Sequence, residues 1–235
     1  MTNNTSTVSD ATWAGGLVRL THCGECNALY DLRDPCPVCG HVIDLSPQRV
    51  KIDDVEVMLP ATTQGAIPWS AHVLLNQMRM EWRRPLLEQG NAFGSSQRLV
   101  IVVLFWSLFE VLTDRFYEAA LADLPGLLDK ELLNRFSSIG SRLDRLHRAV
   151  WGTTFWDDLV TAGYPEAATH LKLVQERRNA FVHGDPEAIN DALVDATMEH
   201  LLEVQLGWVA VFNKRCTGIK RKVPIWQADL KSRQK

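Results

Sequence analysis

The sequence predicts a mainly α-helical protein, a helical bundle preceded by a small four-cysteine zinc ribbon. Four of the five cysteines fall within the first 40 residues, in two Cys-x2-Cys pairs. From Pro68 onward the chain reads as a succession of helices separated by Gly and Pro. The stretch Leu99–Phe109 is apolar except for Ser107, so its helix is expected to lie buried at the centre of the bundle.

Length and composition fit an ordinary globular protein. The 235 residues suit one medium domain with a small accessory unit. Hydrophobic residues make up 46% and charged residues 23%, enough to bury a sizeable core. The net charge of −3 excludes a general electrostatic attraction to nucleic acid.

No membrane or export segment is expected. The polar N-terminal residues lack the layout of a secretory signal. The longest apolar stretch is far shorter than the roughly 20 residues that cross a bilayer. These features predict a cytoplasmic protein without membrane contact, in a compartment where thiols stay reduced and clustered cysteines bind metal.

The cysteine spacing predicts one structural zinc ion. Nine residues separate the two pairs, and Gly24, Pro37 and Gly40 suit the tight turns that aim two sulfurs at one ion. Four thiolates fill a tetrahedral shell, so flanking His22 and His41 are not needed and no position stays open for catalysis. Unrelated thiols or a redox pair are the alternative. The predicted ligands are Cys23, Cys26, Cys36 and Cys39.

Composition divides the chain into four parts. Residues 1–45 are expected to form the zinc-ribbon module. The resemblance to zinc ribbons extends over only about 25 of these residues. Residues 46–67 read as a linker with short strands, residues 68–218 as the helical domain and residues 219–235 as a basic tail. From residue 214 onward there are eight basic residues and one acid, which attract polyanions or simply form a solvated terminus.

Helix breaks are legible within the helical domain. Gly90, Gly140, Gly152 and Gly184 are expected to separate helices, and Asp185 with Pro186 to begin the last one. Expected helices are Ser70 to about Glu88, Ser95 to Leu121, Asp129–Phe136, Arg142–Val150, a turn over Thr154–Val160, Pro165–His183 and Asp185 to about Asn213. The tryptophans are expected in the core, Cys216 as a partly buried residue, and His147, His170 and His200 at the surface or core edge.

The segment Arg178–His183 is the richest candidate for chemistry. Asn179 and His183 lie four residues apart and share a helix face. His183 would end its helix, where carbonyl dipoles favour the charged imidazole, and a nearby arginine can bind phosphate through two hydrogen bonds. These features suit proton transfer and charge stabilisation. In the alternative interpretation, Asn179 and His183 cap the last turn and the arginines face solvent.

This segment resembles the signature of the HEPN superfamily, an arginine, a polar residue, three further positions and a histidine. The resemblance extends over about 150 residues of helical pattern. In that family a central apolar helix carries an acidic residue. Glu110, within Phe105–Leu112, matches this position, and Asp114 follows one turn later.

The resemblance implies a helical bundle that pairs as a homodimer around a shared cleft. Active members are metal-independent endoribonucleases in which a 2′-hydroxyl attacks the adjacent phosphate. By this likeness His183 handles protons, Arg178 stabilises the charged phosphorane, Asn179 orients the site and Glu110 supports it. The implied setting is toxin–antitoxin or antiviral defence, with RNA as substrate and an antitoxin or defence-system protein as partner.

A second function stays open. Toxin members usually stand alone, whereas here a zinc ribbon precedes the helical domain. Many superfamily members also bind without cleaving. The alternative is therefore a non-catalytic scaffold, built on a HEPN dimer with a structural zinc ribbon, that binds RNA or protein.

Overall fold

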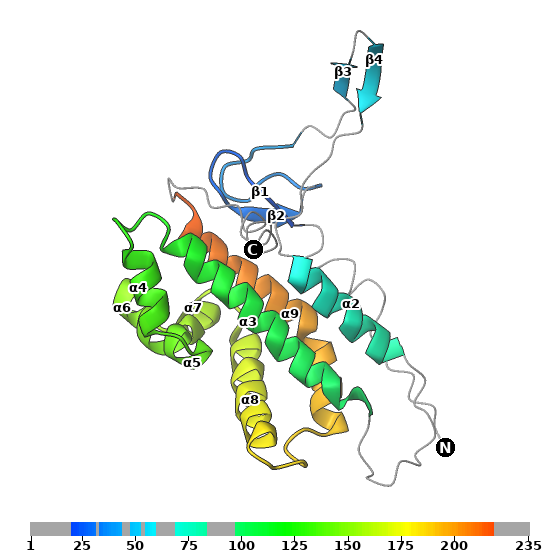
Figure 1. Cartoon of the computed structure of the whole chain (residues 1–235), viewed down its shortest axis with the longest axis vertical. Helices are drawn as coiled ribbons and strands as arrows, with labels where there is room; N and C mark the ends of the chain where they lie inside the picture. The colour runs from blue at the N-terminus through cyan, green and yellow to red at the C-terminus, as the bar shows by residue number, and fades with distance from the viewer. Residues whose placement is uncertain are drawn as a thin grey trace.

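The computed structural model describes residues 20–31, 33–43, 48–52, 55–59, 69–83 and 97–218. This part of the chain is mainly helical and carries two small antiparallel hairpins toward its N-terminal end (Figure 1). The predicted fold class, a mainly α protein with a group of four cysteines in front, is confirmed. Among the described residues, no helix is both long enough and apolar enough to cross a bilayer.

Helix α3 (Val100–Ala120) lies at the centre, as its apolar sequence predicts. Helices α2 (Trp69–Arg83), α8 (Pro165–Val182) and α9 (Asp191–Cys216) all pack against it. The shorter elements are η2 (Gln97–Leu99), α4 (Leu128–Arg135), α5 (Ile139–Ser141), the π-helical η3 (Arg142–Leu146), α6 (His147–Trp151) and α7 (Phe155–Thr161).

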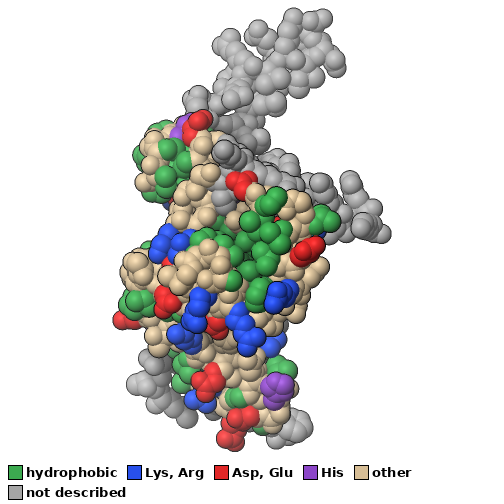
Figure 2. Space-filling model, turned by 90° about the vertical axis from the view of Figure 1, so that its left-hand side faces the viewer, with side chains coloured by type: hydrophobic (Ala, Val, Ile, Leu, Met, Phe, Trp, Pro, Cys, Tyr) green, Lys and Arg blue, Asp and Glu red, His purple; other side chains and the backbone are tan. Residues whose placement is uncertain are grey.

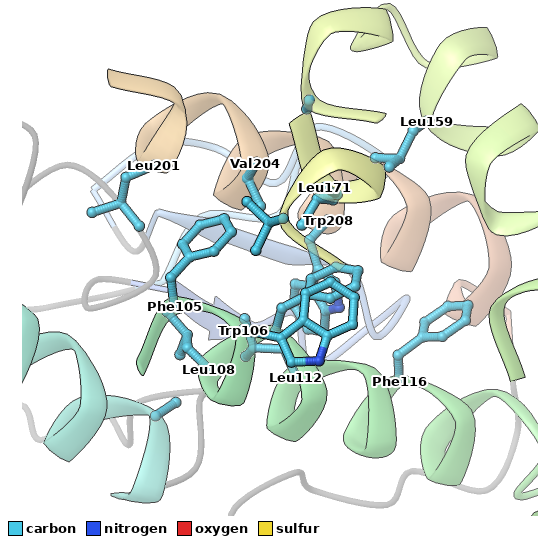
Figure 3. Packing of buried hydrophobic residues seen from close by; sticks show 14 of the residues in the cluster. Phe105, Trp106, Leu108, Leu112, Phe116, Leu159, Leu171, Leu201, Val204 and Trp208 are labelled. Atoms are coloured by element: carbon cyan, nitrogen blue, oxygen red, sulfur yellow. The ribbon is translucent and has the colours of Figure 1, made fainter. Parts of the chain in front are cut away.

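Large aromatic side chains fill the space between α3 and α9 (Figure 3). Trp106 and Trp208, one from each helix, are both 1% exposed. Phe116 makes edge contacts with Phe155 and Phe212, so α7 joins the same core. Burial of such side chains supplies the main driving force for the bundle, about 25 cal/mol for each Å² of apolar surface removed from water.

Capping residues set several helix boundaries. Thr154 begins α7 with a capping box, because its hydroxyl accepts the Asp157 N–H while the Asp157 carboxylate accepts the Thr154 N–H. Gly184, at φ +103°, follows the last turn of α8, as predicted. The last helix begins at Asp191, later than predicted. Residues 185–190 form turns instead, because Ala188 and Ile189 bury their side chains in the core.

The expected break at Gly140 is wrong. Gly140 lies inside α5, which continues through η3 and α6 as far as Trp151. The chain breaks earlier, and Ser138 caps α5 by accepting the Ser141 N–H. A Cβ at Gly140 would lie 3.2 Å from Nε2 of Gln175, so this glycine serves a close approach between α5 and α8.

The hairpins lie before the bundle. Strands β1 (Leu20–His22) and β2 (Leu29–Asp31) pair antiparallel, with Thr21 opposite Tyr30. Strands β3 (Gln48–Ile52) and β4 (Val55–Leu59) pair antiparallel where the linker was expected to hold short strands. The remainder of that linker, residues 84–96 and the basic tail 219–235 lie outside the described residues.

Substitution of Gly207 by alanine should destabilise the protein. In an open helix this change stabilises by about 1 kcal/mol, but a Cβ here would lie 2.9 Å from Leu159 Cδ2 and 3.1 Å from Tyr164 Cγ. We expect the free energy of unfolding to fall by about 1–3 kcal/mol in denaturant titration. Leu206→Ala, at the exposed neighbouring position, is the control and should cost less. A gain in stability for Gly207→Ala would contradict the packing described.

Candidate functional site

The two cysteine pairs lie in two copies of the same backbone turn. In the first turn the Cys23 N–H donates to the Ala28 carbonyl at 2.8 Å, and the Asn27 N–H donates to the Cys23 carbonyl at 3.1 Å. In the second turn the Cys36 N–H donates to the His41 carbonyl at 2.8 Å, and the Gly40 N–H donates to the Cys36 carbonyl at 2.9 Å. Asn27 and Gly40 both have positive φ, 66° and 73°, which lets each turn close.

The turns bring all four sulfurs together. Cys23 and Cys39 sulfurs lie 3.4 Å apart, those of Cys26 and Cys36 lie 3.5 Å apart, and all four fall within 4.8 Å of one another. Sulfurs about 2.3 Å from a tetrahedral ion would be about 3.8 Å apart. The group could therefore hold one metal ion, and with four sulfurs it would leave no coordination position open.

The pKa values of two cysteines in the group are shifted in opposite directions. Burial raises the pKa of Cys26 to about 12. For Cys36, burial acts to raise the pKa, but backbone N–H groups of Cys39 and Val38 outweigh it and lower the pKa to about 7. Without a cation the group thus holds one readily ionised thiol beside one that stays protonated. Neighbouring His22 lies instead against Phe212, and burial lowers its pKa.

The C-terminal end of α9 holds this module. The Asn213 side-chain amide pairs with the Leu29 backbone of β2 as a neighbouring strand would, donating to its carbonyl at 2.8 Å and accepting its N–H at 2.7 Å. Asn27 Nδ2 donates to the Cys216 carbonyl, and the Gly218 N–H donates to the Cys26 carbonyl. Cys216 itself is fully buried, more deeply than predicted.

A cleft of about 470 Å³ opens between α3, α5 and α8. It brings together three of the four predicted catalytic residues, Glu110 from α3 and Arg178 with Asn179 from α8. Further lining residues are Trp106, Asp114, Ser137, Ser138, Ile139, Gly140 and Gln175. Of these further residues, only Asp114 was named as a site candidate from the sequence. The others could not be predicted, because no local sequence motif indicates that α5 packs close to α8.

Hydrogen bonds fix the polar groups of the cleft. The Trp106 indole N–H donates to the Glu110 carboxylate at 2.7 Å, and Arg178 Nη1 donates to the Asn179 side-chain oxygen at 3.2 Å. Asp114 forms an ion pair with Arg142. Burial raises the pKa of Asp114, and the like charges of Glu118 and Glu110 add to the rise while Arg142 opposes it.

His183 is not among the residues that line the cleft. It forms the C-cap of α8, where its backbone N–H donates to the Asn179 carbonyl at 3.0 Å, and its side chain is exposed. The arginine–histidine motif is therefore divided in one chain, with Arg178 and Asn179 in the cleft and His183 at the helix end.

A buried polar network corrects the expectation for His147. This residue is fully buried, with Nε2 at 2.8 Å from Asp158 Oδ2 and Nδ1 at 3.0 Å from Tyr117 Oη. Burial acts to raise the pKa of Asp158, but hydrogen bonds from Arg215, Lys214 and His147 hold it well below the usual range. Burial also lowers the pKa of His147. This network could not be predicted from a local sequence pattern, because Arg215 lies 57 residues after Asp158.

Glu166, His200 and Glu203 form another close group, at the start of α8. The Glu203 carboxylate is already shared, since Oε1 accepts the Ala167 N–H at 3.1 Å and Oε2 lies 2.9 Å from His200 Nδ1. It therefore caps the first turn of α8. His170, expected at the surface or core edge, is buried and stacks on His200.

Comparisons of the chain with protein-family models, with curated protein sequences and with solved structures found no match. The likeness to the HEPN superfamily consequently rests on the residues of the Arg178–His183 segment and on Glu110.

The four-cysteine group should bind one metal ion per chain. We expect elemental analysis of the purified full chain to find one equivalent of metal, lost in Cys36→Ser because three sulfurs hold the ion less tightly. Cys216→Ala is the matched control, since this buried cysteine stands apart from the group and its loss should leave the metal content unchanged. Equal metal content in all three proteins would contradict the assignment.

Stability should fall as the solution becomes acidic, in part through His170. Burial lowers the pKa of His170 to about 4, with a further reduction from His200. In the unfolded chain His170 binds a proton near pH 6.5, whereas in the folded protein it stays neutral until the pH approaches 4. The contribution of His170 to the free energy of unfolding is therefore full above pH 6.5 and is lost as the pH falls toward 4. Between pH 7.5 and pH 5.0 this loss is about 2 kcal/mol.

Measuring unfolding free energies at both pH values tests this. His170→Gln should reduce the pH-dependent loss by about 1–2 kcal/mol. Thr169→Gln, an exposed change on the same helix, should keep the wild-type dependence. An unchanged difference in His170→Gln would show that other groups carry the dependence.

Proposed function

We propose that the protein is a metal-independent endoribonuclease of the HEPN type that acts as a homodimer. The observation that carries the proposal is the shared cleft of Glu110, Arg178 and Asn179. These residues come from different helices, and the motif that suggested them was read from the sequence alone. The cleft volume of about 470 Å³ falls in the range of small-molecule and nucleotide sites.

The proposed reaction divides roles among the four residues. A base removes the proton from the ribose 2′-hydroxyl, its oxygen attacks the adjacent phosphorus, and the bond to the 5′-oxygen breaks as that oxygen takes up a proton. The products are a 2′,3′-cyclic phosphate and a free 5′-hydroxyl. Arg178 stabilises the added negative charge, His183 handles protons, Asn179 holds the guanidinium, and Glu110 supports the site.

Two copies are proposed because one chain divides the motif. His183 lies exposed at the end of α8, and Val182 beside it is 59% exposed. In a homodimer with the two α8 ends facing each other, the His183 of one copy would meet the cleft of the other. Such an interface would also cover Val182.

The surface offers further support for a polyanionic substrate. Lys and Arg side chains gather across the middle of the face that carries α4 to α7 (Figure 2). Exposed Arg145 and Arg148, on η3 and α6, belong to this side of the bundle. Positive groups on a protein surface attract RNA phosphates and raise the rate of encounter.

For the cysteine group we propose zinc. Four thiolates in a tetrahedral arrangement are typical ligands of a structural zinc ion. With its shell filled, the ion would brace the module on α9 and take no part in cleavage. By the family likeness, the proposed setting is cytoplasmic toxin–antitoxin or antiviral defence, with an antitoxin or defence-system protein as partner.

One observation favours a second candidate, a non-catalytic scaffold that binds RNA or protein. In the single chain the proton-handling group His183 stays outside the cleft. A binder would need Arg178 for phosphate contact but would not need His183.

Neighbouring arginines give a matched test of the catalytic proposal. Both Arg177 and Arg178 lie on α8, but only Arg178 lines the cleft. In magnesium-free buffer, with retained zinc verified by elemental analysis, we expect the wild type to cleave RNA and leave 2′,3′-cyclic phosphate ends. Arg178→Ala should lower the rate by about 10² or more, Arg177→Ala by less than about threefold. His183→Ala should lower it by about 10² or more while keeping RNA affinity.

Three outcomes would count against the proposal or against a role assigned in it. Intact RNA across transfer, ribosomal and messenger substrates with a verified dimer would reject it. Equal losses in both arginine variants would reduce the role of Arg178 to general charge. RNA binding that needs Arg178, with no cleavage and a silent His183→Ala, would favour the scaffold.

A further inference from the structure

A continuous chain of polar contacts runs through the bundle from the seat of the cysteine module to the wall of the cleft. Its members are Asn213 to Gly218 at the end of α9, Asp158, His147, Tyr117 and Arg142. The proposed cleavage chemistry uses none of these groups. Tyr117, His147 and Asp158 are buried in the core, where a polar group costs free energy unless it is hydrogen-bonded.

At the cleft end, Arg142 ties the wall to α3. Its Nε donates to the Phe136 carbonyl at 2.7 Å and Nη2 donates to the Leu133 carbonyl at 3.3 Å. Nη1 pairs with Asp114, which lines the cleft. The segment held in this way leads directly into Ser137–Gly140, the wall opposite α8. The Arg142 side chain thus fixes how far this wall stands from α3.

In the middle of the chain, Tyr117 connects Arg142 to the buried charges. Tyr117 Oη donates to the Arg142 backbone carbonyl at 2.7 Å and lies 3.0 Å from His147 Nδ1. Tyr117 and His147 are fully buried, and Asp158 is 1% exposed. Displacement of any member leaves a polar group without its partner in a medium of low dielectric constant, so the members of the network hold one another in place.

At the far end, consecutive residues of α9 serve both the network and the cysteine module. Arg215 contacts the Asp158 carboxylate at 2.6 and 2.7 Å, and Lys214 contacts it at 2.9 Å. Asn213 holds β2, and the Cys216 carbonyl accepts from Asn27. Displacement of the module from this turn therefore disturbs the residues that neutralise Asp158.

We infer that Arg142 is a positioning residue of the cleft, and that the Tyr117–His147–Asp158 network couples its placement to docking of the metal-bound cysteine module on α9. We expect metal binding to stabilise the folded module, because one ion bound by all four sulfurs would hold the two turns together. The folded module holds the last turn of α9, which fixes Asp158 and, through His147 and Tyr117, the carbonyl of Arg142. The consequence for RNA cleavage rests on the proposed function, whereas the coupling itself does not.

Hydrogen–deuterium exchange on the metal-loaded full chain tests the coupling without reference to activity. Chelation of the metal should speed exchange in residues 20–43 and also in residues 133–142, the cleft wall. Tyr117→Phe keeps the ring and removes the hydroxyl, so residues 133–142 should exchange about fivefold faster with metal still bound. Chelation should then add little at the wall.

Thr113→Val is the matched control, since Thr113 is a fully buried residue of the same helix whose hydroxyl has no hydrogen-bond partner among the described residues. It should behave as the wild type. Asn213→Ala removes the amide that holds β2 without touching a sulfur, and should speed exchange at the wall with metal retained. This variant decides the matter if chelation also exposes the centre of α3 and so unfolds the whole domain.

The inference fails if Asn213→Ala or chelation changes only the module and the end of α9, or if Tyr117→Phe matches Thr113→Val. An activity measurement separates it from the proposed function. If the wild type cleaves RNA, Tyr117→Phe should lower kcat by about fivefold with KM nearly unchanged. If the wild type does not cleave, the proposed function fails and exchange alone decides the coupling.

Discussion

The burial of α3 constrains the rest of the structure. Residues such as Phe105, Phe109 and Phe116 cannot face water without a large loss of free energy, so other helices must cover nearly the whole circumference of α3. Helices α2, α8 and α9 provide this cover. The strip that stays open carries Glu110 and Asp114, and α5 and α8 rise beside it. The cleft thus lies at a place where packing around α3 ends and polar side chains are exposed.

Features that depend on short sequence spacing were predictable. The Cys-x2-Cys pairs specify their own turns, and Gly184 ends α8 where its positive φ is needed. Phe105, Trp106 and their neighbours specify a central helix through composition alone. Features that depend on distant contacts were not predictable. Asp158 finds Arg215 only after the bundle folds, and the same folding buries His147. Gly140 looked like a break because its close partner, Gln175, lies on another helix.

The candidate site was predictable in the same measure. Arg178, Asn179 and Glu110 were identified from the motif and from the central helix, and the structure gathers them in one cleft. The motif could not reveal that His183 lies beyond the cleft, because the helix period describes one helix and not its position against a partner. Serines 137 and 138 escaped notice because irregular segments carry no periodic signal.

The electrostatics of the cleft define what it can bind. Asp114 is neutralised by Arg142, which leaves the carboxylate of Glu110 and the guanidinium of Arg178 as the opposed charges. An anion entering the cleft therefore depends on Arg178, and any disturbance of the Arg142 ion pair would add a second negative charge to the wall. Any change in packing that moves Arg142 away from Asp114 would therefore change the charge that an anion meets in the cleft. In the coupling proposed above, the cysteine module acts on the cleft through structure alone, since four sulfurs around one ion would leave no position for a reacting group.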